Sequence, residues 1–253
     1  MRPFIEATIR SLTHRFGIDV VRYQKNTCPP DFSEQNIRIF NAVRPYTMTG
    51  PERVNALIES VRYLVANRID GAMVECGVWK GGSTMAIALT LKELGAENRK
   101  LFLYDTFSGM SKPGDVDVSL HGTTAYETFT QTKLSDDSSN WCLSPLHEVK
   151  ENVFSTGYPK ENIHFIEGKV EETIPRNIPT EIALLRLDTD WYESTKHELV
   201  HLFPLLKQNG VLVIDDYGHW EGARKAVDEY ISDNDIRILL NRIDYTGRIA
   251  LKT

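Results

Sequence analysis

The chain has 253 residues, of which 41% are hydrophobic and 25% are charged, and its formal net charge is −6 at pH 7. These totals fit one globular α/β domain with additions, and the acidic balance without a basic cluster argues against a nucleic-acid-binding surface. The three cysteines form no Cys-x-x-Cys pair, so we expect reduced thiols and a cytoplasmic protein. No apolar run is long enough for a membrane span and no signal-peptide pattern is present, so we expect no membrane partner.

The first 45 residues are predicted to form an N-terminal helical extension, followed by a main domain over 46–253. Apolar residues from Phe4 to Phe16 recur at helical spacing, and Cys28-Pro29-Pro30 ends this pattern. A second short helix is predicted over Ser33–Val43. The main domain then opens with Pro51, which suits the first turn of a helix with an apolar stripe.

A strand, a glycine-rich turn and a helix are predicted over residues 71–94. The apolar run from Gly71 leads into Gly77-Val-Trp-Lys-Gly81-Gly82-Ser83, and the helix is expected over Thr84–Leu94. Glycines allow a ligand to approach the backbone, and a helix N-terminus offers free N–H groups. The spacing matches neither the dinucleotide fingerprint nor a P-loop, and such a turn can also be purely structural.

The second strand, from Lys100, ends at Asp105, where an acid can accept hydrogen bonds from ribose hydroxyls or cap a helix. Residues 108–144 are then polar and rich in Gly, Ser, Thr and Asp, with little apolar periodicity. A segment of this length and composition is typical of a lid or of disorder. Because it leaves the ligand-binding end of a strand, we expect a mobile lid that closes over substrate.

Three acids are predicted to converge where two later strands end. One strand ends at Asp188, and the other runs from Gly210 to Asp215-Asp216, with a crossover helix predicted over Ser194–Lys207. If these strands are parallel neighbours, the three carboxylates meet at one edge of the sheet. Unpaired carboxylates repel each other and resist burial, so a hard cation such as Mg²⁺ is expected there. The alternative is that these acids cap helices or remain solvated.

The remaining predicted elements complete an open sheet. A helix is expected over Leu146–Thr156, a strand from Ile163 to Glu167, and a helix over Ala223–Ser232. Two closing strands, Ile236–Ile243 and Gly247–Lys252, are predicted to form an antiparallel hairpin. In such sheets ligands bind beyond the carboxyl ends of the strands, which is where the glycine turn and the acids lie.

Five ordered motifs resemble those of the macrocin O-methyltransferase family, which comprises class I S-adenosylmethionine-dependent, metal-dependent sugar O-methyltransferases. The motifs are Tyr46-Thr-Met-Thr-Gly-Pro-Glu-Arg53, Val74-Glu-Cys-Gly-Val-Trp-Lys-Gly-Gly-Ser83, Tyr104-Asp-Thr-Phe-Ser-Gly-Met110, Leu185-Arg-Leu-Asp-Thr-Asp-Trp-Tyr-Glu-Ser-Thr195 and Val213-Ile-Asp-Asp-Tyr217. The resemblance implies an α/β Rossmann-like methyltransferase fold with a mostly parallel seven-stranded sheet, a C-terminal antiparallel hairpin and the N-terminal helical extension. It also implies S-adenosylmethionine and Mg²⁺ as cofactors.

The resemblance further assigns roles to individual residues. The residues expected to bind S-adenosylmethionine are Glu75, Gly77, Gly81, Gly82 and Ser83 at its methionine part, Asp105 at its ribose, Thr106, Gly168 and Val170 beside ribose and adenine, and Thr47, Met48 and Asp188 near the sulfonium. Asp188, Asp215 and Asp216 are the expected Mg²⁺ ligands, and Asp188 is the expected general base. His219 and Tyr217 are candidate substrate contacts, and Trp79 and Trp191 are candidate pocket residues. Arg186 is expected to be structural, and Asp190 and Glu193 to cap the following helix.

The expected reaction is Mg²⁺-dependent methyl transfer to one hydroxyl of a vicinal diol, on a deoxysugar of a natural product. Chelation of two adjacent hydroxyls lowers the pKa of the attacked one and orients it, and a carboxylate then accepts the proton. The alternatives are a catechol-like phenol as acceptor, or a non-catalytic module that binds a nucleotide and a metal. A small glycoside is the expected partner, together with further copies of the chain in a homo-oligomer.

Overall fold

The computed structural model describes residues 13–18 and 28–253, and the chain divides into two compact units, 1–30 and 31–253. The predicted helix from Phe4 to Phe16 falls mostly outside the described residues. Helix α2 (Glu34–Val43) buries Ile39, Phe40 and Val43 and packs against α3 and α4 of the second unit. The boundary between the units therefore lies closer to the N-terminus than the expected one at 45/46.

Local sequence signals determine where the first helices begin. Ser33 caps α2 by accepting a hydrogen bond from the backbone N–H of Asn36 at 3.1 Å. A short 3₁₀ turn, η1 (Arg44–Tyr46), precedes helix α3 (Pro51–Ala66), which has proline in its first turn as predicted. The predicted apolar stripe of α3 is buried and comprises Val54, Leu57, Ile58, Val61 and Leu64.

Seven strands form one sheet in the order β5-β2-β1-β6-β7-β9-β8, and the first five of these are parallel. Strands β7 and β9, and strands β8 and β9, pair antiparallel. The prediction of a mostly parallel seven-stranded sheet closed by an antiparallel hairpin is therefore confirmed. The strands are β1 (Ala72–Cys76), β2 (Leu101–Asp105), β5 (Ile163–Glu167), β6 (Ile182–Leu187), β7 (Leu206–Ile214), β8 (Asn241–Arg242) and β9 (Arg248–Leu251).

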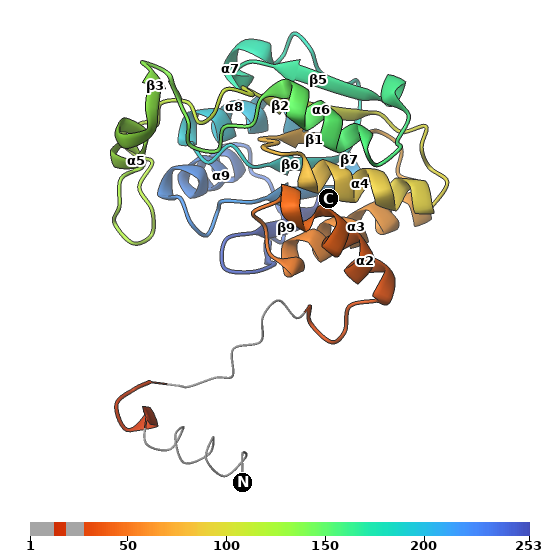
Figure 1. Cartoon of the computed structure of the whole chain (residues 1–253), viewed down its shortest axis with the longest axis horizontal. Coiled ribbons are helices and arrows are strands. Elements are labelled where there is room, and N and C mark those ends of the chain that lie inside the picture. The colour runs from red at the N-terminus through yellow and green to blue at the C-terminus, as the bar shows by residue number, and fades with distance from the viewer. Residues whose placement is uncertain (1–12, 19–27) are drawn as a thin grey trace. The chain divides into compact units, whose positions relative to one another are not determined.

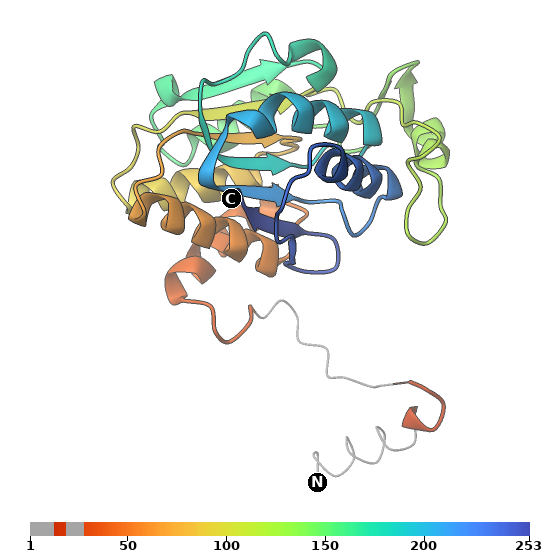
Figure 2. The ribbon, with the colours of Figure 1, turned by 180° about the vertical axis from the view of Figure 1, so that it is seen from behind.

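Helices cover both faces of the sheet (Figures 1 and 2). Helices α3, α4 (Gly82–Glu93) and α6 (Leu146–Phe154) lie on one face, and α7 (Val170–Thr173), α8 (Tyr192–Leu202) and α9 (Glu221–Asp233) lie on the other. Alternate residues of the central strands, such as Val74, Cys76, Leu185 and Leu187, join the core cluster under α8 and α9. The residues between them, Glu75 and Arg186, therefore point to the opposite face of the sheet.

Two strands differ in length from the prediction. Strand β7 begins at Leu206 rather than Gly210, because α8 ends at Leu202 and a 3₁₀ turn, η3 (Phe203–Leu205), leads directly into the strand. The strand predicted over Ile236–Ile243 is reduced to the two residues of β8. Its apolar residues Ile236, Ile238 and Leu240 pack against the core cluster instead of pairing in the sheet.

The predicted lid, residues 108–144, contains secondary structure that the sequence did not indicate. It forms helix α5 (Ala125–Thr132), which buries Ala125 and Phe129, and a small antiparallel sheet of β3 (Lys133–Ser135) and β4 (Ser138–Ser139). Asp117 anchors the segment to the domain, because its buried carboxylate accepts hydrogen bonds from the backbone N–H groups of Gly114 at 2.7 Å and Tyr192 at 2.8 Å. Movement of this segment as a lid stays a prediction.

All three cysteines lie within the described residues and none forms a disulfide. Among the described residues, no helix is both long enough and apolar enough to cross a membrane.

Candidate functional site

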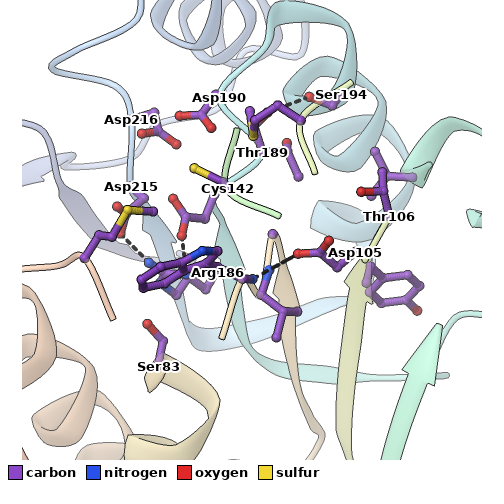
Figure 3. A pocket seen from close by; sticks show the side chains of 18 of the residues that line it. Ser83, Asp105, Thr106, Cys142, Arg186, Thr189, Asp190, Ser194, Asp215 and Asp216 are labelled. Carbon is purple, nitrogen blue, oxygen red and sulfur yellow. Dashed lines mark hydrogen bonds and ion pairs between the residues drawn. The ribbon is translucent and has the colours of Figure 1, made fainter. Parts of the chain in front are cut away.

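A cavity of about 430 Å³ opens at the carboxyl ends of the parallel strands (Figure 3). Its walls come from the loop before α3, the glycine turn, the ends of β2, β5, β6 and β7, and the segment 108–144. Most of the residues singled out in the sequence line this cavity. They are Thr47, Met48, Gly77, Trp79, Gly82, Ser83, Asp105, Thr106, Gly168, Val170, Asp188, Asp215, Asp216 and His219.

Four of the candidate binding residues, Glu75, Gly81, Trp191 and Tyr217, are not among the residues that line the cavity. Glu75 is buried and its carboxylate is bound by Arg186 and by the hydroxyl of Thr84. The Cα of Gly81 faces α6, where an added Cβ would lie 2.8 Å from a methyl group of Val153. Tyr217 donates its hydroxyl hydrogen bond to Asp228 at 2.8 Å, and its ring lies under the guanidinium groups of Arg224 and Arg248.

Asp105 holds the glycine turn in place. One carboxylate oxygen accepts hydrogen bonds from the backbone N–H groups of Val78 at 2.6 Å and Trp79 at 3.0 Å, and the other accepts one from Phe107 at 2.7 Å. Asp105 is therefore not a helix cap but a brace between the ends of β1 and β2. At Gly77, where φ is +82°, an added Cβ would lie 2.0 Å from the carbonyl oxygen of Asp188, so the turn packs directly against the end of β6.

The three predicted metal ligands come together at the ends of β6 and β7. Asp188, Asp215 and Asp216 each contribute one carboxylate oxygen to a group in which all three oxygens lie within 4.8 Å of one another. The parallel register brings them together, because Leu187 lies opposite Ile214 and the acids follow directly after these residues. The arrangement brings the acids to one wall of the cavity (Figure 3).

The expectation that these carboxylates are unpaired was wrong, because Arg186 binds two of them. One terminal nitrogen of Arg186 lies 2.6 Å from Glu75 Oε1 and 2.7 Å from Asp188 Oδ2, and the other lies 2.7 Å from Asp215 Oδ1. Arg53 binds the second oxygen of Asp215, and its Nε lies 2.7 Å from Asp244 Oδ2. The β1–β6 register places Arg186 directly opposite Glu75. The alternation of side chains along the two strands was thus the signal for this ion pair.

Asp216 and its neighbour Asp190 lie in a different environment. Burial, and then the charge of Asp190, hold the pKa of Asp216 well above its usual range, and its Oδ2 is buried without a hydrogen-bond partner. Burial and the charge of Asp188 raise the pKa of Asp190 to about 7. Asp190 does not cap α8 as expected, because the backbone N–H of Tyr192, the first residue of that helix, donates its hydrogen bond to Asp117.

The donor set of this cluster is chemically suited to a hard divalent cation. The side chains offer only oxygen atoms, which Mg²⁺ and Ca²⁺ prefer over nitrogen and sulfur. Burial raises the pKa of Asp188 as well, although the charge of Arg186 counteracts this rise. A cation next to Asp188 and Asp216 would favour their ionised forms and give the free oxygen of Asp216 a partner.

An aromatic wall, formed by Trp141, Trp191 and Trp220, stands beside the carboxylates. The ring centroids lie 5.6 Å apart for Trp141 and Trp191, 6.1 Å for Trp141 and Trp220, and 5.2 Å for Trp191 and Trp220, all in edge-to-face arrangements. Trp141 and Trp220 line the cavity, whereas Trp191 is buried behind them and donates its indole N–H to the carbonyl of Ser111 at 3.1 Å. Trp141 and Trp220 were not predicted from the sequence, because they lie outside the glycine and aspartate motifs.

Glu198 is a buried acid outside the cavity lining, and its burial is expected to make the stability of the fold depend on pH. It is fully buried, accepts a hydrogen bond from the hydroxyl of Thr189 at 2.9 Å, and its Oε2 has no partner. Burial raises the pKa of Glu198 well above its usual range. Above about pH 4.5 the folded protein keeps the proton of Glu198, whereas the unfolded chain releases it. The free energy of unfolding therefore decreases as the pH rises from this value towards the pKa of Glu198 in the folded state.

We expect Glu198→Gln to remove this contribution. Between pH 5 and pH 8, the free energy of unfolding of the wild type should fall relative to the variant by up to about 1.4 kcal/mol per pH unit. Urea unfolding at several pH values measures this difference. Glu181→Gln, on a half-exposed side chain paired with Lys207, is the control. Parallel pH profiles of wild type and Glu198→Gln would contradict the prediction.

Comparisons with known proteins agree on one family. The family model described as macrocin-O-methyltransferase matches residues 30–251 of the chain. The chain is 30% identical over 208 residues to the 8-demethyl-8-(2,3-dimethoxy-alpha-L-rhamnosyl)-tetracenomycin-C 4'-O-methyltransferase of Streptomyces olivaceus, covering 80% of this chain and 74% of the relative. It is 29% identical to the mycinamicin III 3''-O-methyltransferase of Micromonospora griseorubida, covering 80% of this chain and 76% of the relative.

Solved structures show the same fold. The O-methyltransferase NovP superposes with a TM-score of 0.72 at 27% sequence identity, covering 82% of each chain. The calicheamicin methyltransferase CalS11 superposes with a TM-score of 0.60 at 17% identity, covering 92% of this chain and 99% of the other, which shows similarity of fold alone.

Proposed function

Because the chain belongs to the macrocin O-methyltransferase family and is an S-adenosylmethionine-dependent O-methyltransferase, we propose that it methylates one hydroxyl of a vicinal diol on a deoxysugar, with Mg²⁺ as the metal cofactor. The observation that carries the metal part is the cluster of Asp188, Asp215 and Asp216, with a buried, unpartnered oxygen on Asp216. The cluster lines the same cavity as the glycine turn. A methyl donor bound at the glycine turn and a hydroxyl bound at the three aspartates would therefore lie in the same cavity.

The donor side of the proposed site is the glycine turn and its surroundings. Gly82 and Ser83, the first two residues of α4, line the cavity, and a helix N-terminus offers free N–H groups to the carboxylate of a bound amino-acid group. In this proposal Asp105 binds the ribose, and Gly168 and Val170, which line the same cavity, flank the ribose and adenine. The loop residues Thr47 and Met48 close the same end, and an added Cβ at Gly82 would lie 2.5 Å from the carbonyl oxygen of Tyr46. These contacts support the proposed cofactor site.

The acceptor side of the proposed site contains the base. When bound, S-adenosylmethionine supplies a methyl group on a positively charged sulfur, and Mg²⁺ lowers the pKa of a neighbouring hydroxyl. Asp188 accepts the proton of the attacking hydroxyl as the new C–O bond forms and the S–C bond breaks. Arg186 binds one oxygen of Asp188 and thereby fixes the direction of its carboxylate.

The aromatic wall favours a sugar ring as acceptor. Trp141 and Trp220 present apolar ring surface beside Asp190 and Asp216, against which the C–H face of a sugar can pack while its hydroxyls reach the acids. The names of the relatives support this choice, since one acts on a rhamnosyl-tetracenomycin. A catechol-like phenol would also offer two adjacent hydroxyls to the acids and a flat ring to the wall, and it is the second candidate acceptor.

A substrate panel tests the proposed function. The protein is incubated with S-adenosylmethionine, Mg²⁺ and matched sets of deoxysugar glycosides and catechols, and products are analysed by mass spectrometry. We expect methylation of vicinal-diol glycosides, loss of turnover in excess EDTA, and recovery on addition of Mg²⁺. Exclusive methylation of catechols would refute the sugar acceptor, and full turnover in EDTA would refute the metal cofactor. Light scattering of the same preparation tests the expected homo-oligomer.

We expect Trp141→Ala to raise the KM for the glycoside acceptor about tenfold with a smaller change in kcat. Loss of the apolar face removes on the order of 1 kcal/mol or more of binding energy that is present before and during the reaction. Steady-state kinetics with the acceptor identified in the panel measures this. Tyr126→Ala, an exposed ring of the same segment outside the cavity, is the control. An unchanged KM would exclude Trp141 from the acceptor site.

A further inference from the structure

Arg186 occupies an unusual position for a charged residue. It lies on β6 with neighbouring strands on both sides, opposite Glu75 of β1 and Val213 of β7, and its side chain is only 3% exposed. A buried guanidinium is costly unless its donors are satisfied by acceptors. Here its two terminal nitrogens contact three carboxylates, one from each of the three central strands or the loops that follow them.

Two of these three carboxylates, Asp188 and Asp215, belong to the proposed metal site. Arg186 binds Asp188 through Oδ2 and Asp215 through Oδ1, so a rigid planar group fixes the spacing of the two side chains. Figure 3 shows Arg186 beside Asp215. Glu75 binds the same terminal nitrogen of Arg186 as Asp188 does, and the hydroxyl of Thr84 on α4 binds Glu75 in turn. The chain of contacts therefore runs from the helix of the glycine turn to the acids of the cavity.

A purely structural reason does not account for the choice of partners. A buried salt bridge between Glu75 and Arg186 would satisfy the strand register without either aspartate. The guanidinium is instead shared with the two acids that point into the cavity, where they repel each other and Asp216. A fixed positive charge at this point opposes that repulsion, and its geometry determines where the oxygens lie.

We infer that Arg186 is a positioning residue for divalent-cation binding, which holds Asp188 and Asp215 at the spacing that the ion requires. The inference rests on the proposed function, because it takes the cluster of acids as the metal site. The planar fork and the fixed charge contribute separately. A lysine keeps the charge but lacks the fork, and a glutamine keeps hydrogen-bond donors but lacks the charge.

The test measures binding of Mn²⁺, a paramagnetic substitute for Mg²⁺, to the intact protein saturated with S-adenosylhomocysteine. Electron paramagnetic resonance gives the dissociation constant for wild type, Arg186→Lys and Arg186→Gln, and circular dichroism gives their melting temperatures. We expect both variants to bind Mn²⁺ about ten- to a hundredfold more weakly at a temperature where they are folded. Arg62→Lys, at a partly buried ion pair with Glu93 between α3 and α4, is the matched control and should bind as wild type does.

The possible results separate the roles. If Arg186 acted only as a repelling charge, Arg186→Lys would match wild type and Arg186→Gln would bind more tightly. If its role were only structural, both variants would melt earlier with dissociation constants within twofold of the wild-type value. Either result overturns the inference. A variant that stays unfolded at saturating Mn²⁺ also overturns it. A variant that folds only when Mn²⁺ is bound supports it. Absence of Mn²⁺ binding by wild type would overturn the proposed metal dependence itself, and this inference with it.

Discussion

Asp188→Asn is expected to reduce kcat for methyl transfer by at least about a thousandfold. The substitution preserves the shape of the side chain, but the amide cannot accept the proton of the attacking hydroxyl, a role that contributes about 10²–10⁴ to the rate. It also replaces a charged ligand of the proposed metal site and removes one anion from Arg186. Initial rates with the acceptor identified in the panel measure the loss.

The binding of S-adenosylhomocysteine separates a chemical defect from a folding defect in this variant. Calorimetry should give a dissociation constant within a few-fold of the wild-type value, because the glycine turn and Asp105 are unchanged. Asp228→Asn, which alters a carboxylate that accepts a hydrogen bond from Tyr217 outside the cavity, is the control and should retain wild-type turnover. Substantial turnover by Asp188→Asn would remove Asp188 from the role of base.

Gly77→Ala is expected to lower the free energy of unfolding by at least about 3 kcal/mol and to weaken cofactor binding. The new methyl group would lie 2.0 Å from the carbonyl oxygen of Asp188, and backbone atoms have little freedom to move away. The ends of β1 and β6 are also joined there, because the N–H of Asp188 donates to the carbonyl of Cys76 at 2.9 Å. Relief of the clash therefore displaces Asp188 together with the glycine turn.

A second glycine isolates the effect of the clash. Gly122 has a φ of +81°, almost the same as the +82° of Gly77, but an added Cβ there meets nothing within 4 Å. Gly122→Ala thus carries the backbone strain alone, which costs on the order of 1 kcal/mol. Urea unfolding of both variants, with calorimetry for S-adenosylhomocysteine, gives the comparison. Equal destabilisation by the two substitutions would show that the contact between the turn and β6 is unimportant.

The sheet was predictable because its core strands are short apolar runs separated by turn residues. β1, β2 and β6 lie close to where the alternation of hydrophobic runs and glycines placed them. The start of β7 was missed because Lys207, Gln208 and Asn209 are polar and largely exposed, so they resemble a loop although they belong to the strand. Tertiary packing, rather than local sequence, also determined that residues 236–240 lie on the core without pairing.

At the site, the sequence identified the acids but not their partners. Parallel strands that end in aspartates predict a cluster, since the carboxyl ends of neighbouring strands meet at one edge. Arg53 lies more than a hundred residues away from Asp215 in the chain and approaches it only through the packing of α3. No local sequence pattern therefore predicts this ion pair. Trp141 was missed for the same reason, because its neighbours Trp191 and Trp220 come from the starts of two later helices.

The bond between Arg53 and the C-terminal hairpin has a consequence for how the site is assembled during synthesis. Arg53 forms ion pairs with both Asp215 and Asp244. Strand β9 pairs with β7 from Val211 to Ile214. During synthesis, the three aspartates of the proposed metal site leave the ribosome before Asp244 and β9 do. Until then β7 is an edge strand, so a polypeptide that stops before residue 241 carries the acids and both arginines but lacks Asp244, which holds Arg53 in place.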